Sequence, residues 1–523
     1  MKQIYVLLIT IFLTPCGTWA QSGNMANGLT WKYEGTTLTV SKTGEGSGVM
    51  NTFGSVPWYS YMRTIEKVII SEGVTSIGYG AFSNCSSITD LTLPESLVKI
   101  DNSAFYRCSG LTNLVLPKSL KEIEYEAFSY CYNIKGEIFI PASVTLIGNK
   151  AFESCMNIMS FSVSNDNKNY KSIDGAIISQ NGKYLVAFPA GKKGTYSIPE
   201  GIESISSDAF LNCIGLTGKL TIPEGVTSIG KNAFTYCENL TGISLPSTLT
   251  TIDLPAFNNC NSLTTIDVNS NNKHFKSIDG VLYTKDGSSI IRYPTNKTGK
   301  YSIAEGVETV REYAFYGCDN LSALKLPSTL TTINNYAFYF CRNISGISFP
   351  SALMTIGENA FKGCSGLTNE LIIPENVTDI GYEAFEGTKI TTLTLKKTNP
   401  ITLGSSAFFY NVPLKVIYVP IVSVELYKNS EWAAFYYIIQ ADLSTSTENL
   451  PDPSILVFPN PTSGYVTVTG LSIGEVINVY TVSGTQIIKH TATSEKVILD
   501  LSGLSKGVYL LQTEQKSIKL IKN

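Results

Sequence analysis

Residues 94–117 read PESLVKIDNSAFYRCSGLTNLVLP, and variants of this stretch return along most of the chain. The stretch carries an Ala-Phe pair, Ala104-Phe105, and a cysteine three residues after the phenylalanine. Apolar residues alternate at Leu114 and Leu116, which is typical of a short strand with one buried face. The proline that follows has no N–H for a continuing ladder and ends that strand. One such unit is too small to fold alone, so we expect the units to stack.

Twelve Ala-Phe pairs set the period of this unit along the chain. Their phenylalanines stand at positions 82, 105, 128, 152, 210, 234, 257, 315, 338, 361, 385 and 408. The spacing is 23 or 24 residues wherever it is regular, and two intervals span 58 residues. A fixed period in the twenties is typical of a solenoid, in which each coil contacts only its neighbours. We therefore predict a β-rich solenoid, whose extended surface favours binding over catalysis.

Ten of the eleven cysteines occupy one phase of the repeat. They are Cys85, Cys108, Cys131, Cys155, Cys213, Cys237, Cys260, Cys318, Cys341 and Cys364. The last two Ala-Phe pairs carry Thr388 and Asn411 at this place. In-register stacking would put successive thiols about 4.8 Å apart, a distance that permits some disulfides. A row at one phase is instead typical of a packing position, so we predict buried free thiols. The row neither converges tetrahedrally nor contains histidine, so no metal site is predicted.

The two long intervals hold matched insertions. They lie near residues 163–205 and 268–310. The turn pairs Asn181-Gly182 and Asp286-Gly287 stand between alternating apolar residues, which predicts a β-hairpin in each insertion. Asparagine-rich segments at 165–167 and 269–271 suggest calcium loops, but the acidic residue that closes an EF-hand loop is missing. We therefore predict that these segments form turns.

The first residues have the pattern of a secretory signal. Lys2 precedes an apolar run over residues 4–13, which is too short to span a bilayer. Small residues predict cleavage after Ala20, so that residues 1–20 form the signal peptide. A rival hypothesis makes Cys16 an acylated lipoprotein cysteine, although the proline beside it fits that pattern badly. No later stretch of sequence is long and apolar enough to predict a membrane helix.

The rest of the chain divides by composition. The predicted parts are an N-terminal β cap (21–64), the solenoid with its insertions and a C-terminal cap (65–442), a linker (443–454) and a C-terminal domain (455–523). The linker is polar, contains proline and lacks aromatic residues. The C-terminal cap is expected to contain a short helical turn. Short alternating strands between turn signals predict a small β-sandwich in the last part.

In phase, spacing and insertions, the repeat resembles the BspA-like leucine-rich repeats over residues 29–440. The segment Pro57-Trp58-Tyr59-Ser60-Tyr61 of the N-terminal cap follows the same pattern. The resemblance implies a leucine-rich-repeat solenoid on a secreted or cell-surface protein. It also implies binding to other proteins or to host matrix, without enzymatic activity.

The last part of the chain resembles the C-terminal sorting domain of type IX secretion cargo. The residues that carry this resemblance include Pro459, Asn460, Pro461, Gly464, Gly484, Gly507 and Tyr509. Phe458 stands where that pattern often has tyrosine. The resemblance implies handling by the type IX secretion machinery and export across the outer membrane of a Gram-negative bacterium. It also implies removal of the domain in or near the linker.

The charge and the histidine content of the chain argue against two classes of function, nucleic-acid binding and catalysis. The formal net charge is −3 and no basic run occurs, which argues against a nucleic-acid partner. The two histidines, His274 and His490, lie in the second insertion and in the C-terminal domain. Neither is expected to pair with a repeat cysteine as base and nucleophile. We therefore predict no enzymatic activity and no cofactor.

Tyrosines that follow the Ala-Phe pair are the candidate partner-binding residues. They are Tyr106, Tyr130, Tyr236, Tyr316 and Tyr339. Tyrosine gives a large contact area at low entropic cost, so an exposed row would suit an interface. The same side chains could instead stack on one another along the solenoid. The function hypotheses are an adhesin for extracellular or host proteins, or a structural or glycan-contacting envelope protein without a specific protein ligand.

Overall fold

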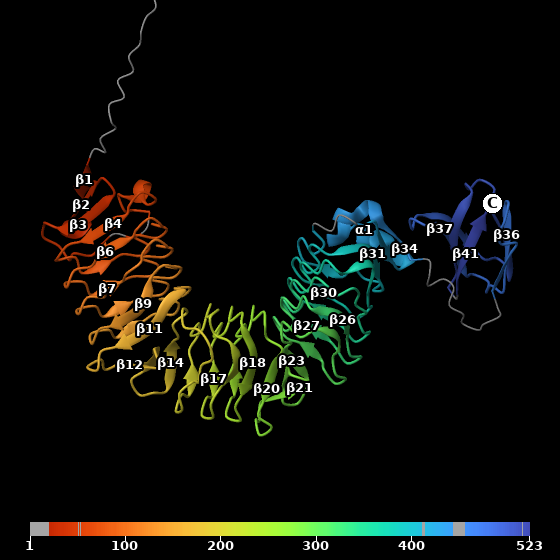
Figure 1. Ribbon diagram of the computed structural model, residues 1–523. Coiled ribbons are helices and arrows are strands. Elements are labelled where there is room, and N and C mark those ends of the chain that lie inside the picture. The colour runs from red at the N-terminus through yellow and green to blue at the C-terminus, as the bar shows by residue number, and fades with distance from the viewer. Residues whose placement is uncertain (1–19, 51, 53, 410–413, 443–454, 515) are drawn as a thin grey trace, which may run out of the picture. The chain divides into compact units, whose positions relative to one another are not determined.

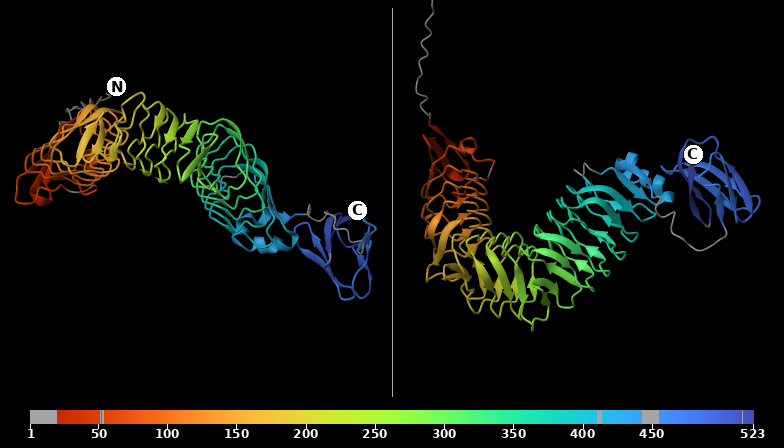
Figure 2. Two further views of the ribbon diagram at one scale, coloured as in Figure 1. Left: turned by 90° about the horizontal axis from the view of Figure 1, so that it is seen from below. Right: turned by 45° about the vertical axis from the view of Figure 1, so that its right-hand side comes forward.

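The computed structural model describes residues 20–50, 52, 54–409, 414–442, 455–514 and 516–523. Residues 1–19 of the predicted signal peptide, with Cys16, lie outside these residues, as do Asn411 and the predicted linker 443–454. The chain divides into two compact units. Unit 1 comprises residues up to 263 with 269–273, and unit 2 comprises 264–268 with 274–523. Coils lie side by side within each unit (Figures 1 and 2).

Each coil contributes a short strand of two residues to one side of the solenoid. Its second residue is apolar and points inward, and equal phase brings it beside its counterpart, as in the pairing of Ile100 with Ile77. In unit 1 these strands are β5 (Ser76–Ile77), β7 (Lys99–Ile100), β8 (Glu122–Ile123), β10 (Leu146–Ile147), β15 (Ser204–Ile205), β17 (Ser228–Ile229) and β19 (Thr251–Ile252). In unit 2 they are β25 (Thr309–Val310), β27 (Thr332–Ile333), β28 (Thr355–Ile356), β30 (Asp379–Ile380) and β32 (Thr402–Leu403).

Longer parallel strands form the other side of the solenoid, and in several coils a proline directly follows or comes one residue after the strand. In unit 1 they are β4 (Lys67–Ile70), β6 (Asp90–Thr92), β9 (Lys135–Ile140), β11 (Asn157–Val163), β16 (Gly218–Thr221) and β18 (Leu240–Leu245). In unit 2 they are β20 (Thr265–Val268), β24 (Gly299–Ser302), β26 (Leu321–Lys325), β29 (Thr368–Ile373), β31 (Lys389–Leu395), β33 (Val416–Val419) and β34 (Ile439–Ala441). Alternation puts one face of these strands inward, as Ile138 and Ile140 of β9 show.

The Ala-Phe corner joins the two sides and holds neighbouring coils together. The N–H of Phe82 donates to the carbonyl of Ala104 in the next coil at 2.8 Å. The N–H of Asn84 donates likewise to Tyr106 at 2.7 Å. The N–H of Ser83, which stands between them, donates within its own coil to Gly80. The corner therefore satisfies its backbone donors without a regular helix or strand.

Buried phenylalanines stack ring on ring through the interior of each unit. In unit 1, Phe82 and Phe105 have ring centres 5.1 Å apart, and Trp58 of the cap lies 5.4 Å from Phe82. In unit 2, Phe385 and Phe408 are 5.1 Å apart, and Trp432 of the C-terminal cap lies 5.9 Å from Phe408. A cap tryptophan thus ends each row, which keeps the last ring covered.

The two insertions contain the predicted hairpins. Their strands are β12 (Tyr170–Ile173), β13 (Ala176–Ser179) and β14 (Tyr184–Ala187), then β21 (Phe275–Ile278), β22 (Val281–Thr284) and β23 (Ser289–Arg292). In both, the last strand pairs antiparallel with the hairpin and parallel with the next coil's short strand.

Each insertion also contains a coil that is not among those marked by the twelve Ala-Phe pairs of the regular period. The N–H of Phe188 donates to Ala209 at 2.8 Å, and its ring lies 4.9 Å from that of Phe210. Tyr293 repeats these contacts with Ala314 and Phe315 at 2.7 and 5.0 Å. The third strand of each insertion therefore belongs to a coil. The predicted turns Asn181-Gly182 and Asp286-Gly287 join the middle strand to this coil strand, whereas the hairpins that are purely inserted are β12-β13 and β21-β22.

The caps and the C-terminal domain complete the described chain. The N-terminal cap contains β1 (Gln21–Asn24), η1 (Ala26–Gly28), β2 (Leu29–Glu34), β3 (Thr37–Lys42) and η2 (Tyr59–Tyr61). The C-terminal cap contains η3 (Ile421–Ser423), α1 (Val424–Lys428) and η4 (Glu431–Ile438). The C-terminal domain has two antiparallel sheets, ordered β35-β36-β39 and β38-β37-β40-β41. Its strands are β35 (Leu456–Phe458), β36 (Tyr465–Thr469), β37 (Val476–Thr481), β38 (Gln486–Thr491), β39 (Lys496–Asp500), β40 (Gly507–Gln512) and β41 (Ser517–Lys522).

Candidate functional site

The repeat cysteines are part of the core. All ten described cysteines are free and buried, which confirms the predicted burial of the row. Most donate their S–H to the phenylalanine carbonyl of the preceding coil, as Cys108 does to Phe82 at 3.1 Å and Cys341 to Phe315 at 2.9 Å. Burial raises the pKa of the Cys85 thiol to about 12. Thiolate is therefore scarce at neutral pH, and these residues are not activated nucleophiles.

We expect the ten repeat thiols to resist alkylation in the native protein. The thiolate is the reactive form, and both burial and the raised pKa suppress it. Titration with a thiol reagent at pH 8 should leave them unmodified over hours, whereas denaturant should expose all ten. Rapid modification in the native state would contradict the buried row.

Asn167, in the first asparagine-rich segment, and Asn272, directly after the second, form hydrogen bonds with the backbone. Asn167 is fully buried, and its Nδ2 donates to the carbonyls of Pro141 and Val144 at 2.8 and 3.0 Å. Its Oδ1 accepts from the N–H groups of Asn169 and Tyr170, both at 2.8 Å. Asn272 donates to two carbonyls in the same way. The amides thus tie each hairpin to the coil before it, which agrees with the predicted turns.

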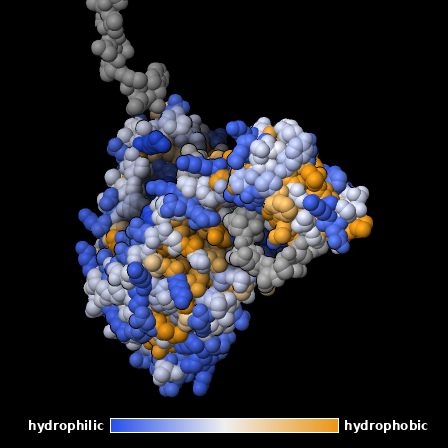
Figure 3. Space-filling model, turned by 90° about the vertical axis from the view of Figure 1, so that its right-hand side faces the viewer, coloured by the Kyte–Doolittle hydropathy of each residue, from blue (hydrophilic) through white to orange (hydrophobic). Residues whose placement is uncertain are grey.

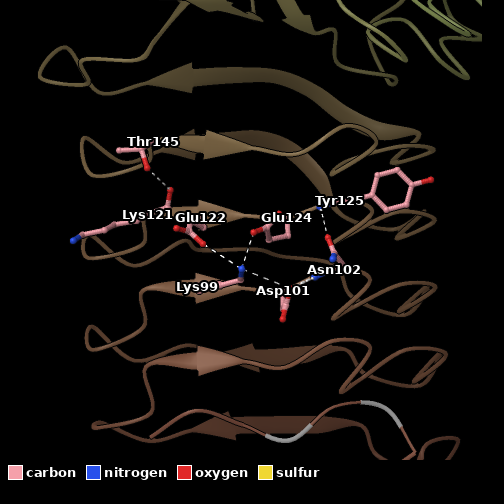
Figure 4. Close-up of polar contacts among 8 residues, drawn as sticks. All are labelled: Lys99, Asp101, Asn102, Lys121, Glu122, Glu124, Tyr125 and Thr145. Carbon is pink, nitrogen blue, oxygen red and sulfur yellow. Dashed lines mark hydrogen bonds and ion pairs between the residues drawn. The ribbon is translucent and has the colours of Figure 1, made fainter. Parts of the chain in front are cut away.

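A charged cluster crosses two coils on the short-strand side of unit 1 (Figure 4). Lys99 Nζ lies 2.7 Å from Glu124, 3.3 Å from Glu122 and 3.8 Å from Asp101. The hydrogen bond to Glu124 is the main cause that raises the pKa of Lys99. Asn102 accepts from the N–H of Tyr125 beside it. Lys99 pairs with carboxylates of its own coil and of the next one, so the cluster links the two coils.

Two of the predicted tyrosines meet in unit 1. Tyr106 and Tyr130 are half-buried, and their rings contact edge to face with centres 5.4 Å apart. The guanidinium of Arg107 lies 5.2 Å from the first ring centre and 5.4 Å from the second. The Tyr130 hydroxyl donates to Glu153 at 3.3 Å. Burial, then the charge of Glu153, raises the pKa of Tyr130 to about 12.

Four tyrosines form a two-by-two group in unit 2, which we call the tyrosine array: Tyr313, Tyr316, Tyr336 and Tyr339. Tyr313 stacks on Tyr336 and Tyr316 stacks on Tyr339, each with ring centres 5.1 Å apart. The two stacks touch at 5.8 and 5.6 Å. All four side chains are half-buried. Two of the array residues precede the Ala-Phe pair, and sequence reasoning missed them because it examined only the residues that follow it.

Tyr236 stands apart from the other predicted tyrosines. It is 42% exposed and lies in a coil of unit 1 far along the sequence from Tyr130. The five predicted residues are therefore not one row: two lie in the cluster around Arg107, two in the tyrosine array, and Tyr236 in neither.

The described residues form concave surface in several places. A cavity of about 660 Å³ lies between the last Ala-Phe coil and the C-terminal cap, with Phe408, Phe409 and Phe435 in its lining. A hollow of about 340 Å³ lies beside Tyr59 and Arg63 of the N-terminal cap, and one of about 30 Å³ lies beside the first insertion. Apolar surface on the face shown in Figure 3 is divided into patches by hydrophilic residues. Among the described residues, no cluster of His, Cys, Asp and Glu could hold a metal ion, and no helix is long and apolar enough to cross a membrane.

The predicted sorting residues lie outside the strands of the C-terminal domain, except Gly507 and Tyr509, which belong to β40. Asn460 donates through Nδ2 to Lys519 at 2.5 Å and accepts at Oδ1 from Ile521 at 2.9 Å. The Tyr509 hydroxyl donates to the carbonyl of Ser505 at 2.8 Å. The remaining predicted positions are Pro459, Pro461, Gly464, Gly484 and Gly507. Asn460 thus ties the start of the domain to its last strand, β41. Ala20, the predicted cleavage residue, is exposed at the start of the described chain.

Comparisons with known proteins fit this architecture. A family described as "Secretion system C-terminal sorting domain" matches residues 456–523. Such a domain marks export by the type IX secretion system, so the protein is secreted or displayed on the cell surface. Among proteins with curated descriptions, none matches the chain.

Solved structures of other leucine-rich repeat proteins are similar. A leucine-rich repeat protein of Eubacterium ventriosum is 27% identical with a TM-score of 0.50, and the match covers 67% of this chain and 96% of that one. A leucine rich cell surface protein of Faecalibacterium prausnitzii is 24% identical with a TM-score of 0.42, over 80% and 97% of the two chains. The family described as "BspA type Leucine rich repeat region" matches residues 55–179, 187–280 and 292–415. These segments exceed half of the sequence, and the chain belongs to the BspA-type leucine-rich repeat family.

Proposed function

We propose that this protein binds other proteins outside the cell, as an adhesin or host-protein-binding module, and catalyses no reaction. The tyrosine array is the observation that carries the proposal. Its four half-buried rings lie on the Ala-Phe corners of two neighbouring coils. Rings that already pack on one another lose little side-chain entropy when a partner covers them, so the array is suited to an interface.

Ring geometry favours a protein partner over a glycan. A sugar ring stacks on an open aromatic face, whereas rings within the array stack face to face at 10° and 11°. Much of their facial area is therefore occupied by each other. Ring edges and hydroxyl groups remain for contact with a partner, and these suit hydrogen bonding and close packing with side chains.

Chemistry argues against catalysis. The repeat thiols are buried and their pKa values are raised, so they lack the reactivity of a catalytic cysteine. His274 is exposed in the second insertion. The repeat thiols and His274 therefore do not provide the nucleophile and base that a hydrolase would need.

A binding panel tests the proposal. The exported protein is presented to immobilised extracellular matrix proteins, serum proteins and a glycan array. We expect binding to at least one protein, and a Tyr316→Ser/Tyr339→Ser variant should lose at least tenfold in affinity. Tyr184→Ser, which changes a tyrosine that is 47% exposed in the first insertion, is the matched control and should bind normally. Retention on glycans alone would support the structural alternative instead.

A further inference from the structure

Arg107 stands at an exposed corner of the second Ala-Phe coil of unit 1. Its side chain is exposed, whereas Cys108 directly after it is fully buried, so the arginine lies on the surface where the chain turns into the core. Its backbone is left-handed, with φ of 59°. Because arginine keeps its proton at every physiological pH, the corner presents a permanent positive charge.

Two tyrosine rings hold this guanidinium in place. Its central carbon lies 5.2 Å from the ring centre of Tyr106, in the same coil, and 5.4 Å from that of Tyr130, in the next coil. The two rings also contact each other edge to face, with centres 5.4 Å apart. A guanidinium against two aromatic rings is a favourable cation–π arrangement. An arginine that is restricted in this way loses less conformational entropy when a partner binds it.

The carboxylates on the corners of the next two coils have other partners. Glu153 is buried and accepts from the Tyr130 hydroxyl at 3.3 Å. Glu126 lies 4.0 Å from Lys150 Nζ. In the described part of the chain, Arg107 forms no ion pair with Asp or Glu. Its guanidinium N–H groups are therefore available to an acceptor from another molecule.

Arg342 of unit 2 combines a ring contact with a carboxylate. The central carbon of its guanidinium lies 4.8 Å from the ring centre of Phe340. One of its guanidinium nitrogens lies 2.5 Å from a carboxylate oxygen of Asp319, in the preceding coil. Asp319 also accepts from the backbone N–H of Arg342 at 3.1 Å. The chain thus brings a ring, a guanidinium and a carboxylate together at one place on its own surface.

Unit 1 has no carboxylate at the phase of the repeat that Asp319 occupies. Asp319 directly follows the repeat cysteine Cys318, and the residues at that phase in the first two Ala-Phe coils are Ser86 and Ser109. Around Arg107 the rings and the guanidinium are present, whereas the residues at the third position carry neutral hydroxyl groups. A carboxylate brought by another molecule would complete the group.

An exposed tyrosine enlarges the surface beside Arg107. Tyr132 is 42% exposed, and its ring meets that of Tyr130 edge to face with centres 5.9 Å apart. Tyrosine and arginine are enriched in protein interfaces, where they contribute much of the binding energy. The surface around Arg107 therefore has the composition of an interface with a protein.

We propose that Arg107 binds the carboxylate of an Asp or Glu side chain of a partner polypeptide, whose chain lies over the tyrosines beside it. The planar guanidinium donates to the carboxylate oxygens in a charge-assisted pair, as Arg342 does to Asp319. The inference rests on the proposed protein-binding function. It adds to the tyrosine array of unit 2 a second binding site, in unit 1, and names the chemistry of the partner there.

Binding of a fluorescent Gly-Glu-Gly-Glu-Gly peptide to the full chain at low ionic strength tests the inference. Arg107→Gln keeps a polar side chain and removes the charge, and it should weaken binding about tenfold. Arg311→Gln is the matched control, because it removes the charge of another exposed arginine, in unit 2, and it should bind like the unchanged protein. Arg107→Lys keeps the charge without the planar group and should recover only part of the affinity.

A Gly-Gln-Gly-Gln-Gly peptide keeps the shape and removes the charge, and it should bind about tenfold more weakly. Equal binding of the two peptides, equal losses from Arg107→Gln and Arg311→Gln, or full binding by Arg107→Lys would overturn the inference. Melting temperatures of the variants confirm that each one folds. If Arg107→Gln binds the proteins of the panel normally, the arginine site is refuted while protein binding stands. If the peptide responds as expected but no protein in the panel binds, the arginine site stands and the proposed function fails.

Discussion

Replacing Phe338 by alanine is expected to lower the free energy of unfolding by about 3–5 kcal/mol. Phe338 is fully buried and stacks between Phe315 and Phe361, with ring centres 4.8 and 4.9 Å away. Removing it leaves a cavity between two coils and breaks two ring contacts. Guanidinium denaturation followed by circular dichroism measures the loss.

An exposed aromatic residue provides the control for this prediction. Tyr184→Ala removes a ring that is 47% exposed and should change the unfolding free energy by less than about 1 kcal/mol. If Phe338→Ala were as mild as Tyr184→Ala, the ring stack would not be a principal source of stability.

Replacing Asn167 by alanine is the second large effect, with an expected loss of about 3–5 kcal/mol. The substitution removes four hydrogen bonds in a fully buried place: two to carbonyls and two from N–H groups. Each buried group left without a partner costs roughly 1–3 kcal/mol, and partial access of water reduces the total. Thermal or chemical denaturation of the full chain measures it.

The Asn165→Ala variant distinguishes the buried hydrogen bonds of Asn167 from calcium binding by the segment. Asn165 is exposed in the same segment, and its replacement should be nearly neutral. Chelator should leave the stability of the unchanged protein and of both variants as it was. Equal losses from the two alanine substitutions, or a loss on adding chelator, would favour a metal loop over the buried amide.

The repeat could be predicted because the same residue types return in every unit. One large ring and one small residue recur at the same phase, and a coil has a single place for each. A regular period therefore predicted both the solenoid and the burial of the cysteines before any contact was known. The turns of the insertions could also be predicted, because Asn181-Gly182 and Asp286-Gly287 are strong turn signals.

The extra coils were missed for a physical reason. Tyr293 follows Arg292 rather than alanine, so the second insertion departs from the pattern. Arg292 is nevertheless buried, since its guanidinium donates to the carbonyls of Tyr313 and Tyr316 at 2.6 and 3.3 Å. An arginine can thus replace the alanine when backbone acceptors surround it. In the first insertion the pair Ala187-Phe188 was visible and could have been found by its distance of 22 residues from Phe210.

The candidate site was only partly predictable. Tyrosine content and phase identified Tyr316 and Tyr339, but whether they would stack or face solvent depends on contacts between coils. Tyr313 and Tyr336 lie before the Ala-Phe pair and reach the same surface because the corner turns between them.

A double-mutant cycle in the phenylalanine row tests the stacking of coils in register most directly. Phe315 and Phe338 are in contact with ring centres 4.8 Å apart, whereas Phe315 and Phe361 are separated by one coil. Alanine substitutions should show a coupling of about 0.5–1.5 kcal/mol for the first pair. The second pair should couple by less than about 0.5 kcal/mol. Equal coupling of both pairs, or none for the pair in contact, would contradict the stacked solenoid.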